Sequence, residues 1–534
     1  MSSTFRAALL IAGFSILSKI LGAVRQAVLA HSFGAGGEID IYVASFRLPD
    51  LLFNFLVIGT LSVAFIPVFV ARLKSDREGA FALASTIFNV TALAMGVLAV
   101  LGASFAGVLI QLIVPGFSAE AQSITASMTR IMMLSPLLFS MSTVLTSVLH
   151  SHKRFLLAAV APLFYNAAII FGVLYFYPRF GLPGLAWGVV LGAFLHFAVQ
   201  SPSAFKLGLR LKNGTVFGDP DIKKIARLFI PRIFGIDLGQ VSLLIASVVG
   251  STLVSGSLAI FYFADDLRAV PLGVFAIPFA VASFPLLSEF FAKKDFAGLK
   301  DFLSKTIVQI LFLIIPISIL VLLTRAQIVR LVLGAGEGTR FDFGATKQTA
   351  QALGFFMLSL FSQSLVPILA KTFYAMQNTV IPVLTAIASA VLNISLALYL
   401  VKILGAEGMA LAFSTASLFN MSVLFFLLHK RLGGLRDKFI AVRVVKIAIA
   451  SVAMAVLTFV TLYGVAPIVD MRTYAGVFIQ AASAFAVALA SYLFVGKLIG
   501  LTEADEIIKV GNVWFKRFTR PVTSTIVNLF IDLK

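Results

Sequence analysis

The chain has 534 residues, of which 60% are hydrophobic and only 12% are charged, and its mean hydropathy is +1.03. A soluble globular domain does not need so much apolar surface, so the composition indicates a polytopic membrane protein. The absence of cysteine excludes disulfides and thiolate metal sites, and the five histidines show no zinc-ligand spacing. The net charge of +19 does not indicate a nucleic-acid partner, because most lysines and arginines fall between apolar stretches, where loops meet an anionic leaflet.

Apolar runs of about 20 residues are long enough to cross a bilayer as helices. The sequence predicts an all-α polytopic protein with about 14 such transmembrane helices. They are expected near residues 5–31, 40–70, 81–114, 123–150, 155–177, 183–205, 225–250, 257–291, 299–323, 348–376, 379–402, 406–429, 443–466 and 473–498.

Basic residues gather in the connections that follow even-numbered spans. The connections 31–39 and 115–123, which follow odd-numbered spans, contain no lysine or arginine, and the segment 325–347 is the basic exception. Because cytoplasmic loops are the basic ones, both termini are predicted to be cytoplasmic.

An internal repeat is visible at an offset of 224 residues. Four residues in the first half have identical counterparts in the second: Leu145, Gly181, Gly184 and Ala186 coincide with Leu369, Gly405, Gly408 and Ala410. The repeat predicts two pseudo-symmetric six-helix lobes, a common plan in transporters. The lobes are expected at 1–207 and 225–431, with a cytoplasmic linker at 208–224 and spans 13 and 14 at 432–498. The basic, aromatic tail 499–534 suits either an amphipathic helix on the cytoplasmic membrane surface or an ordinary charged tail.

Four charged residues, Lys19, Arg25, Asp40 and Arg47, lie inside the first two predicted spans. A charge at the bilayer centre costs about 2.5–3.5 kcal/mol on insertion scales, so these residues are expected to face a wet cavity and a charged substrate. Asp40, Arg47 and Asn54 are each seven apart and predict one polar stripe on the second span. Two alternatives remain. Asp40 caps its helix, and Arg47 pairs with the Asp40 carboxylate or with a neighbouring carbonyl. Lys19 extends its amine to the membrane surface.

The eighth span combines three charges with three prolines. Pro271, Pro278 and Pro285 are seven apart, fall on one side and are expected to bend the helix as a hinge. Asp265 and Arg268 are spaced to neutralise each other. An alternative is a coupling-cation site for Na⁺ or H⁺ among Asp237, Asp265 and Asp266. With no motif for ATP hydrolysis, the energy is expected to come from a gradient, the membrane potential or the substrate itself.

Motifs along the whole chain match one known family. They are Ser18–Arg25, Phe33–Gly36, Asp40, Phe46–Pro49, Ala64–Pro67, Pro162 with Asn166, Gly184–Gly188, Tyr262–Asp265, Pro271–Gly273, and Phe373–Ala375 with Thr379 and Pro382. Together they resemble the MurJ (MviN) family of lipid II flippases, in the multidrug/oligosaccharidyl-lipid/polysaccharide exporter superfamily. The resemblance implies a bacterial inner-membrane protein with two lobes around a central cationic cavity. It also implies a groove for the polyprenyl tail, built with the last two helices.

The resemblance places the pyrophosphate head group of the substrate against Arg25. Arg25 and Asp40 keep the residues usual in the family, Arg47 keeps a basic position, and Lys19 stands where an arginine is usual.

This chain also departs from the family pattern. Phe53 and Asn54 stand where many members have an arginine, and Ile58 replaces an acidic residue. Asp266 replaces the arginine of an Ala-Asp-Arg motif, with Arg268 two residues on. Ser242 and Ala246 stand where an asparagine and an aspartate are common. Either Arg268 and Lys19 rebuild the site, or the substrate differs.

The leading hypothesis is therefore a transporter, not an enzyme, that flips undecaprenyl-pyrophosphate-linked peptidoglycan precursor by alternating access. It needs no cofactor beyond a coupling cation or the membrane potential, and cell-wall synthesis proteins are candidate partners. The alternatives are a flippase for another polyprenyl-linked glycan and a non-transporting scaffold of cell-wall synthesis. A multidrug exporter is disfavoured because a drug site would favour acidic over basic residues in the cavity.

Overall fold

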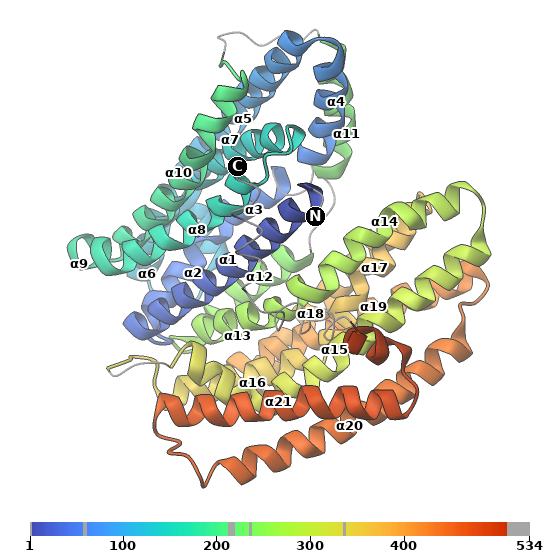
Figure 1. The fold of residues 1–534 in the computed structure, drawn as a ribbon. Helices are drawn as coiled ribbons and strands as arrows, with labels where there is room; N and C mark the ends of the chain where they lie inside the picture. The colour runs from blue at the N-terminus through green and yellow to red at the C-terminus, as the bar shows by residue number, and fades with distance from the viewer. Residues whose placement is uncertain (1–2, 57–60, 212–218, 234–237, 335–337, 510–534) are drawn as a thin grey trace, which may run out of the picture. The chain divides into compact units, whose positions relative to one another are not determined.

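The computed structural model describes residues 3–56, 61–211, 219–233, 238–334 and 338–509 (Figure 1). Within these ranges the regular structure is helical throughout, which confirms the predicted all-α class. Up to the chain midpoint the helices are α1 (Ser3–Phe33), α2 (Gly37–Ser45), α3 (Arg47–Leu56), α4 (Leu61–Ser75), α5 (Arg77–Ile113), α6 (Ala119–Met132), α7 (Leu134–Ser151), α8 (Leu156–Phe171), η1 (Gly172–Phe176), α9 (Tyr177–Phe180), α10 (Leu182–Leu207), α11 (Pro220–Ile233) and α12 (Leu238–Gly250). They continue as α13 (Ser257–Pro271), η2 (Leu272–Ala276), α14 (Ile277–Ala292), α15 (Phe296–Val332), α16 (Phe343–Met357), α17 (Leu360–Ala375), α18 (Val380–Leu404), α19 (Ala406–Leu432), α20 (Asp437–Val465) and α21 (Tyr474–Leu498). The η elements are single π-helical segments.

Ten helical stretches among the described residues are long and apolar enough to cross a membrane, and α16 with α17 forms an eleventh that is bent by 45°. Each of the eleven coincides with a predicted span. The remaining three predicted spans coincide with α1, with α2 to α4, and with α11 and α12. The protein is therefore a multi-span membrane protein, and the total of 14 spans stays a prediction.

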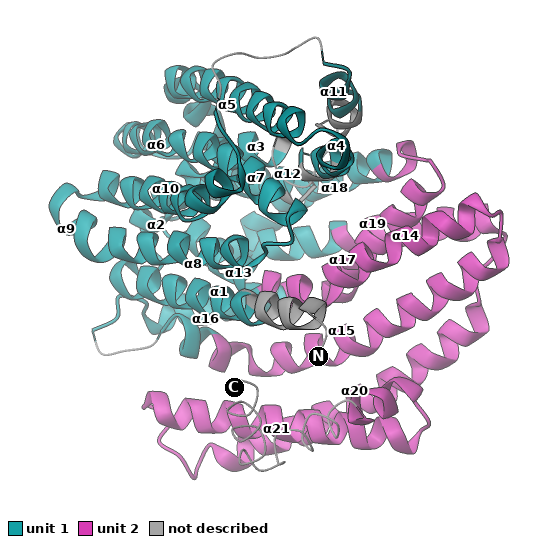
Figure 2. Cartoon of the chain, turned by 45° about the horizontal axis from the view of Figure 1, so that its top comes forward, with its two compact units in different colours: residues 1–267, 329–355, 383–416 teal, residues 268–328, 356–382, 417–534 magenta. Residues whose placement is uncertain are grey.

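The chain divides into two compact units, shown in teal and magenta in Figure 2. Unit 1 comprises residues 1–267, 329–355 and 383–416. Unit 2 comprises residues 268–328, 356–382 and 417–534.

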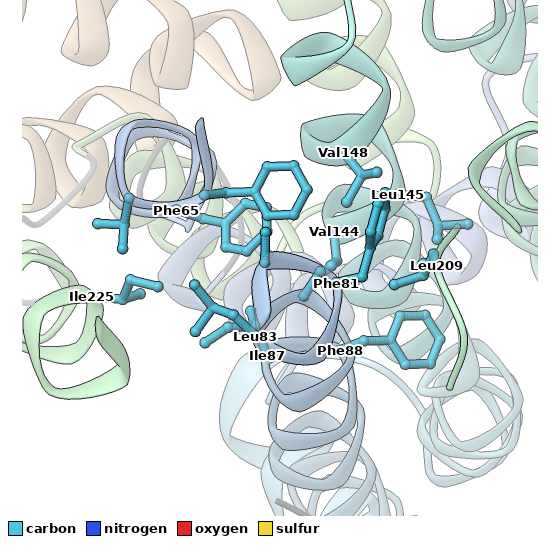
Figure 3. Close-up of a cluster of buried hydrophobic side chains, with 14 of the residues drawn as sticks. Phe65, Phe81, Leu83, Ile87, Phe88, Val144, Leu145, Val148, Leu209 and Ile225 are labelled. Carbon is cyan, nitrogen blue, oxygen red and sulfur yellow. The ribbon is translucent and has the colours of Figure 1, made fainter. Parts of the chain in front are cut away.

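The core of unit 1 includes a cluster of apolar side chains from α4, α5 and α7 (Figure 3). Phe69 is fully buried, stacks on Phe65 at 5.1 Å between ring centroids, and meets Phe81 edge-on at 5.9 Å. Ile225 brings α11 onto the same cluster. Aromatic burial of this kind holds the helices around the cluster in place.

The turns of the two halves repeat at the offset seen in the sequence. Gly181 and Gly405 both adopt the left-handed conformation, with φ of 63° and 62°. Their amides donate to the carbonyls of Tyr177 and Val401, at 2.8 and 2.9 Å. Because glycine adopts positive φ without strain, the same residue recurs where the same turn recurs.

A second pair of turns, also 224 residues apart, has matching backbone geometry although the two turns are built from different residues. Lys153 and Gln377 have φ of 58° and 56°. The amides that follow, of Arg154 and Asn378, donate to the carbonyls of Leu149 and Phe373, both at 2.9 Å. The predicted repeat therefore exists as backbone geometry, while the assignment of whole lobes stays a prediction.

In unit 2, α20 and α21 pack along each other and against α15. The hydroxyl of Tyr492 donates to the carbonyl of Phe312 at 2.7 Å, and the amide of Gln480 donates to the carbonyl of Leu462 at 2.7 Å. The outward faces of α20 and α21 carry large apolar side chains such as Val452, Tyr463 and Leu489. Such faces suit contact with lipid rather than water.

Candidate functional site

The second predicted span is divided into several helices instead of forming one. It consists of α2, α3 and α4, and Phe46 separates the first two. Pro49 has no amide proton to offer the carbonyl of Ser45, and that carbonyl instead accepts a hydrogen bond from Thr129 Oγ1 at 3.2 Å. The predicted polar stripe of Asp40, Arg47 and Asn54 therefore does not lie on one continuous helix.

Asp40 caps a helix that is distant in sequence. Its carboxylate is only 4% exposed and accepts hydrogen bonds from the amides of Gly256 at 2.6 Å and Ala259 at 2.7 Å. These are N-terminal amides of α13, which lack partners inside the helix, and a carboxylate at this end also opposes the positive end of the helix dipole. Gly256 has φ of 94°, and a Cβ there would lie 2.1 Å from the carbonyl oxygen of Ala35. The carboxylate thus holds the start of α13 against the α1–α2 turn.

Arg25 of α1 lies among tyrosines and a carboxylate. Tyr42, Tyr165 and Tyr262 lie in the surroundings of its guanidinium, together with the carboxylate of Asp266. These partners come from α2, α8 and α13. Gln26, next along α1, donates from its amide to the hydroxyl of Tyr262 at 2.9 Å. Four helices therefore converge on the side chain of Arg25.

Arg47 begins α3 and is 7% exposed. It interacts electrostatically with Asp50 on the same helix and with Asp265 on α13. Asp50 interacts with both Arg47 and Arg25, so this one carboxylate joins the two arginines. A buried charge needs such partners, since isolated ions are costly to take out of water.

The two arginines keep donor capacity that the described protein does not use. The Nε atoms of Arg25 and Arg47 are buried and have no hydrogen-bond acceptor within the described residues. Buried polar groups are nearly always hydrogen-bonded in native proteins. An anion with several oxygens, such as a phosphate, is the chemistry that would satisfy them.

Other predicted site residues lie in different surroundings. Lys19 is exposed, and its charge acts on Asp266. Asn54 donates its side-chain amide to the carbonyl of Asp50 at 2.8 Å, within α3. Arg268, in unit 2, donates to the side-chain oxygen of Gln363 and lies 4.8 Å from the ring centroid of Phe356. Asp237 lies outside the described residues, as does Ile58.

The three prolines of the eighth span surround a π-helical segment. Pro271 ends α13 and is buried, η2 follows, and Pro278 is the second residue of α14. Pro285 lies inside α14 and is exposed. A π segment is a common place for a helix to change direction, which agrees with the predicted hinge without testing its motion.

Sequence reasoning missed Asp50, Gln26 and the tyrosines around Arg25. Asp50 follows Arg47 by three residues, a helical spacing that predicts an ion pair. Its position inside the apolar run Leu48-Pro49-Asp50-Leu51-Leu52 concealed that signal. The tyrosines come from three helices and carry no common spacing.

The α1–α2 end of unit 1 is covered by a segment from much later in the chain. The amide of Arg340 donates to the carbonyl of His31 at 3.0 Å, and its guanidinium lies 3.6 Å from Glu38. Glu38 also accepts from the hydroxyl of Tyr177 at 2.7 Å. Phe341 is 2% exposed and packs edge-on against Phe263 at 5.7 Å. This end of unit 1 is therefore closed by backbone, ionic and aromatic contacts at once.

Among the described residues, no three histidine, aspartate or glutamate side chains lie close enough together to hold a metal ion. The arrangement around Arg25 and Arg47 is instead suited to binding an anion.

Comparison with known proteins gives consistent results. The family model described as "Lipid II flippase MurJ" matches residues 29–478. A curated relative from Burkholderia cenocepacia, "Lipid II flippase MurJ", is 28% identical over 437 residues, covering 80% of this chain and 84% of its own. One from Buchnera aphidicola subsp. Acyrthosiphon pisum, "Probable lipid II flippase MurJ", is 28% identical over 495 residues and covers 91% and 96%.

Solved structures agree on the fold. The chain matches "Lipid II flippase MurJ, inward closed conformation" with a TM-score of 0.74 at 22% identity, covering 92% of this chain and 99% of the other. It also matches an inward-facing multidrug resistance MATE transporter of the MOP superfamily, with a TM-score of 0.64 at 14% identity and coverage of 80% and 98%.

Proposed function

Because this chain belongs to the lipid II flippase MurJ family, whose members are transporters and not enzymes, we propose that it carries lipid II across the bacterial cytoplasmic membrane. Lipid II is the undecaprenyl-pyrophosphate-linked precursor of peptidoglycan, so the protein serves cell-wall synthesis. Translocation proceeds by alternating access, in which the cavity opens first to one side of the membrane and then to the other.

The observation that carries this proposal is the pair of arginines with unsatisfied buried donors. Arg25 and Arg47 lie in membrane-spanning sequence, where a cation without a function would only be costly. Their Nε atoms have no acceptor in the described protein. A pyrophosphate supplies several oxygens that match guanidinium geometry.

The remaining residues of the site have separate roles. Asp50 and Asp266 orient the arginines between transport events, and the tyrosine hydroxyls offer hydrogen bonds to the sugars. Lys19 adds a cation near Asp266. Asn54 completes the head-group contacts of unit 1, and Asp40 keeps the α1–α2 end closed by capping α13.

The lipid tail stays in hydrocarbon while the head group crosses. The apolar outward faces of α20 and α21 support a tail groove at these two helices. The bend introduced by Pro271, Pro278 and Pro285 provides the hinge for the transition.

Coupling and topology complete the proposal. A cation, Na⁺ or H⁺, binds among Asp237, Asp265 and Asp266, or the membrane potential acts on the arginines directly. Both termini are cytoplasmic, and cell-wall synthesis proteins are partners on either side of the membrane.

Complementation tests the function directly. A bacterium depleted of its own lipid II flippase should grow with the wild-type chain and not with Arg25→Ala at matched membrane levels. Arg154→Gln is the control, because Arg154 is exposed in the turn between α7 and α8, outside the spans, where its Nη1 donates to the hydroxyl of Ser203 at 3.4 Å. Failure of the well-expressed wild type, or full growth with Arg25→Ala, would overturn the proposal.

A second candidate, a flippase for another polyprenyl-linked glycan, is favoured by one observation. Asp266 stands where the family has arginine, and it neutralises part of the charge of Arg25. A site with less positive charge suits a lipid that carries one phosphate instead of two. Binding of the purified protein to lipid-linked sugars with one and with two phosphates separates the candidates.

A further inference from the structure

An apolar groove of about 700 Å³ lies on unit 1 between α7, η1, α9 and α10. Its lining is entirely hydrophobic and includes Leu138, Phe176, Phe180, Trp187 and Phe194. The volume falls within the range of about 300–1,000 Å³ that is common for small-molecule sites. The helices that form the groove are candidate membrane spans, so the medium that reaches the groove is lipid.

The backbone creates this groove by an unusual approach of two helices. Gly172 and Gly188 face each other so closely that an added Cβ on either would lie within 2.7–2.8 Å of the other's Cα. Gly172 also starts the π-helical segment η1, which widens the helix by one residue. Phe176 ends this segment and Trp187 precedes Gly188, and both side chains line the groove.

The aromatic lining is not a requirement of the repeated fold. At the offset of 224 residues, Phe176, Phe180 and Trp187 correspond to Leu400, Leu404 and Leu411. Pro183, which also lines the groove, corresponds to Glu407, and the neighbouring Arg179 corresponds to Ile403. The second half thus builds the same turn without these three aromatic rings, and its nearest cation is Lys402, one position away from the counterpart of Arg179.

Arg179 precedes Phe180 of the groove lining in the sequence and lies on the short helix α9, immediately before α10 (Figure 1). It is exposed, and its Nη1 donates to the carbonyl of Tyr175 at 2.9 Å. Its guanidinium lies 3.6 Å from the ring centroid of Tyr175. These contacts fix the plane of a group with five donors, and further donors stay available for an anion.

We propose that this groove binds one acyl chain of an anionic glycerophospholipid and that Arg179 binds its phosphate. The chain fills the hydrophobic hollow against Trp187, and the head group lies at the end of α9. An arginine at the membrane surface is well suited to this, because its planar fork matches phosphate oxygens and attracts anionic lipids. The site is separate from the arginines that face lipid II and does not depend on transport.

Trp187 provides a direct reporter, since the chain contains only two tryptophans. In the full-length Trp514→Phe variant, all tryptophan fluorescence comes from Trp187. Phospholipids with brominated acyl chains quench a tryptophan that they touch. We expect brominated phosphatidylglycerol to associate about fivefold more strongly than brominated phosphatidylcholine. One basic residue near the membrane surface attracts an anionic lipid by about 1 kcal/mol, which corresponds to that factor.

Three further variants in this background complete the test. Arg179→Gln should abolish the preference for phosphatidylglycerol, whereas Arg130→Gln, which removes another exposed arginine of unit 1, should retain it. Leu191→Phe narrows the groove and should reduce quenching by both lipids, with folding checked by circular dichroism. Equal association of the two lipids in the parent, or an unchanged preference in Arg179→Gln, would overturn the proposal. Unchanged quenching in a folded Leu191→Phe would also overturn it.

Discussion

Asp40 and Gly256 are joined by a hydrogen bond of 2.6 Å across 216 residues of sequence. The bond places a carboxylate of the second predicted span at the start of the helix that carries Asp265 and Asp266. The α1–α2 turn and α13 are therefore held together by a charged group and not by apolar packing alone. A contact of this kind can be broken and remade without exposing a large apolar surface, which suits an end that must open.

Replacement of Asp40 tests how much the capping of α13 contributes to the stability of the protein. Asp40→Ala leaves two buried amides without a partner and should lower the free energy of unfolding by about 1–3 kcal/mol. Asp40→Asn keeps one acceptor and should lie between Asp40→Ala and wild type. Thermal unfolding of the purified protein measures the effect. Glu506→Gln, which removes an exposed carboxylate near the end of the described chain, is the control and should leave unfolding unchanged.

The pairing of Arg25 with Asp266 predicts that arginine at position 266 is harmful here, although the family favours it. Asp266→Arg places two cations together inside the protein, and such like-charge contacts cost several kcal/mol. The variant should unfold at a lower temperature and bind lipid II weakly. The charge reversal Arg25→Asp with Asp266→Arg should recover part of the stability. Full stability of the single variant would show that the two side chains do not interact.

Position 53 should instead accept the arginine that is common in the family. Phe53 is half-buried, and its ring lies 5.1 Å from that of Phe139. In Phe53→Arg the guanidinium can stack on Phe139 and still reach an anion. We expect a folded protein whose affinity for lipid II rises about fivefold, which corresponds to roughly 1 kcal/mol of binding free energy. Phe53→Met is the control for lost aromatic packing, and equal affinity of the two variants would place the pyrophosphate away from α3.

Alternating access predicts that locking the α1–α2 end stops transport. The backbones of His31 and Arg340 are hydrogen-bonded at 3.0 Å, and the chain has no cysteine of its own. The double variant His31→Cys with Arg340→Cys should cross-link on oxidation, lose lipid II transport in vesicles, and regain it on reduction. Each single variant controls for the substitutions. Undiminished transport in the cross-linked protein would contradict opening at this end.

The connection between α4 and α11 offers a test outside the membrane spans. Arg72 donates to Asp219 and, at 3.1 Å, to Asp221. The hydrogen bond to Asp219 raises the pKa of Arg72 above its ordinary value. A raised pKa stabilises the protein at every pH below the ordinary arginine value, so the contribution of this ion pair to stability is constant through the neutral range. Salt screens the two charges, so the same contribution falls as the salt concentration rises. A double-mutant cycle of Arg72→Gln and Asp219→Asn should give a coupling of about 0.5–1 kcal/mol at low salt that shrinks at high salt.

Most helices of this protein could be predicted from the sequence because hydrocarbon length and apolar composition determine them. The run predicted at 81–114 appears as α5, Arg77–Ile113, with Asp76 capping its start by accepting from the amide of Gly79. The turns at Gly181 and Gly405 were also foreseeable, since glycine marks left-handed backbone. In these cases the residues of the segment itself were enough to predict its structure.

The site could be predicted only in part because its contacts join distant segments. Arg25 and Arg47 were recognisable as cations in apolar sequence, and the spacing of Arg47 and Asp50 indicates one contact, but nothing in the sequence indicates that Asp50 also acts on Arg25. The partner of Asp40 lies on another helix, so its capping role could be foreseen and the capped helix could not. The break at Phe46 was concealed as well, since Pro49 sits in a run that is otherwise apolar enough for one long helix.

The break at Phe46 has a mechanical consequence for the second predicted span. A continuous helix transmits rotation along its whole length, whereas a joint lets one half turn while the other stays. Asp40 on α2 can remain bonded to α13 while α3, which carries Arg47 and Asp50, changes its orientation. On the proposed transport cycle, movement of α3 and opening of the contact between α2 and α13 are therefore separable.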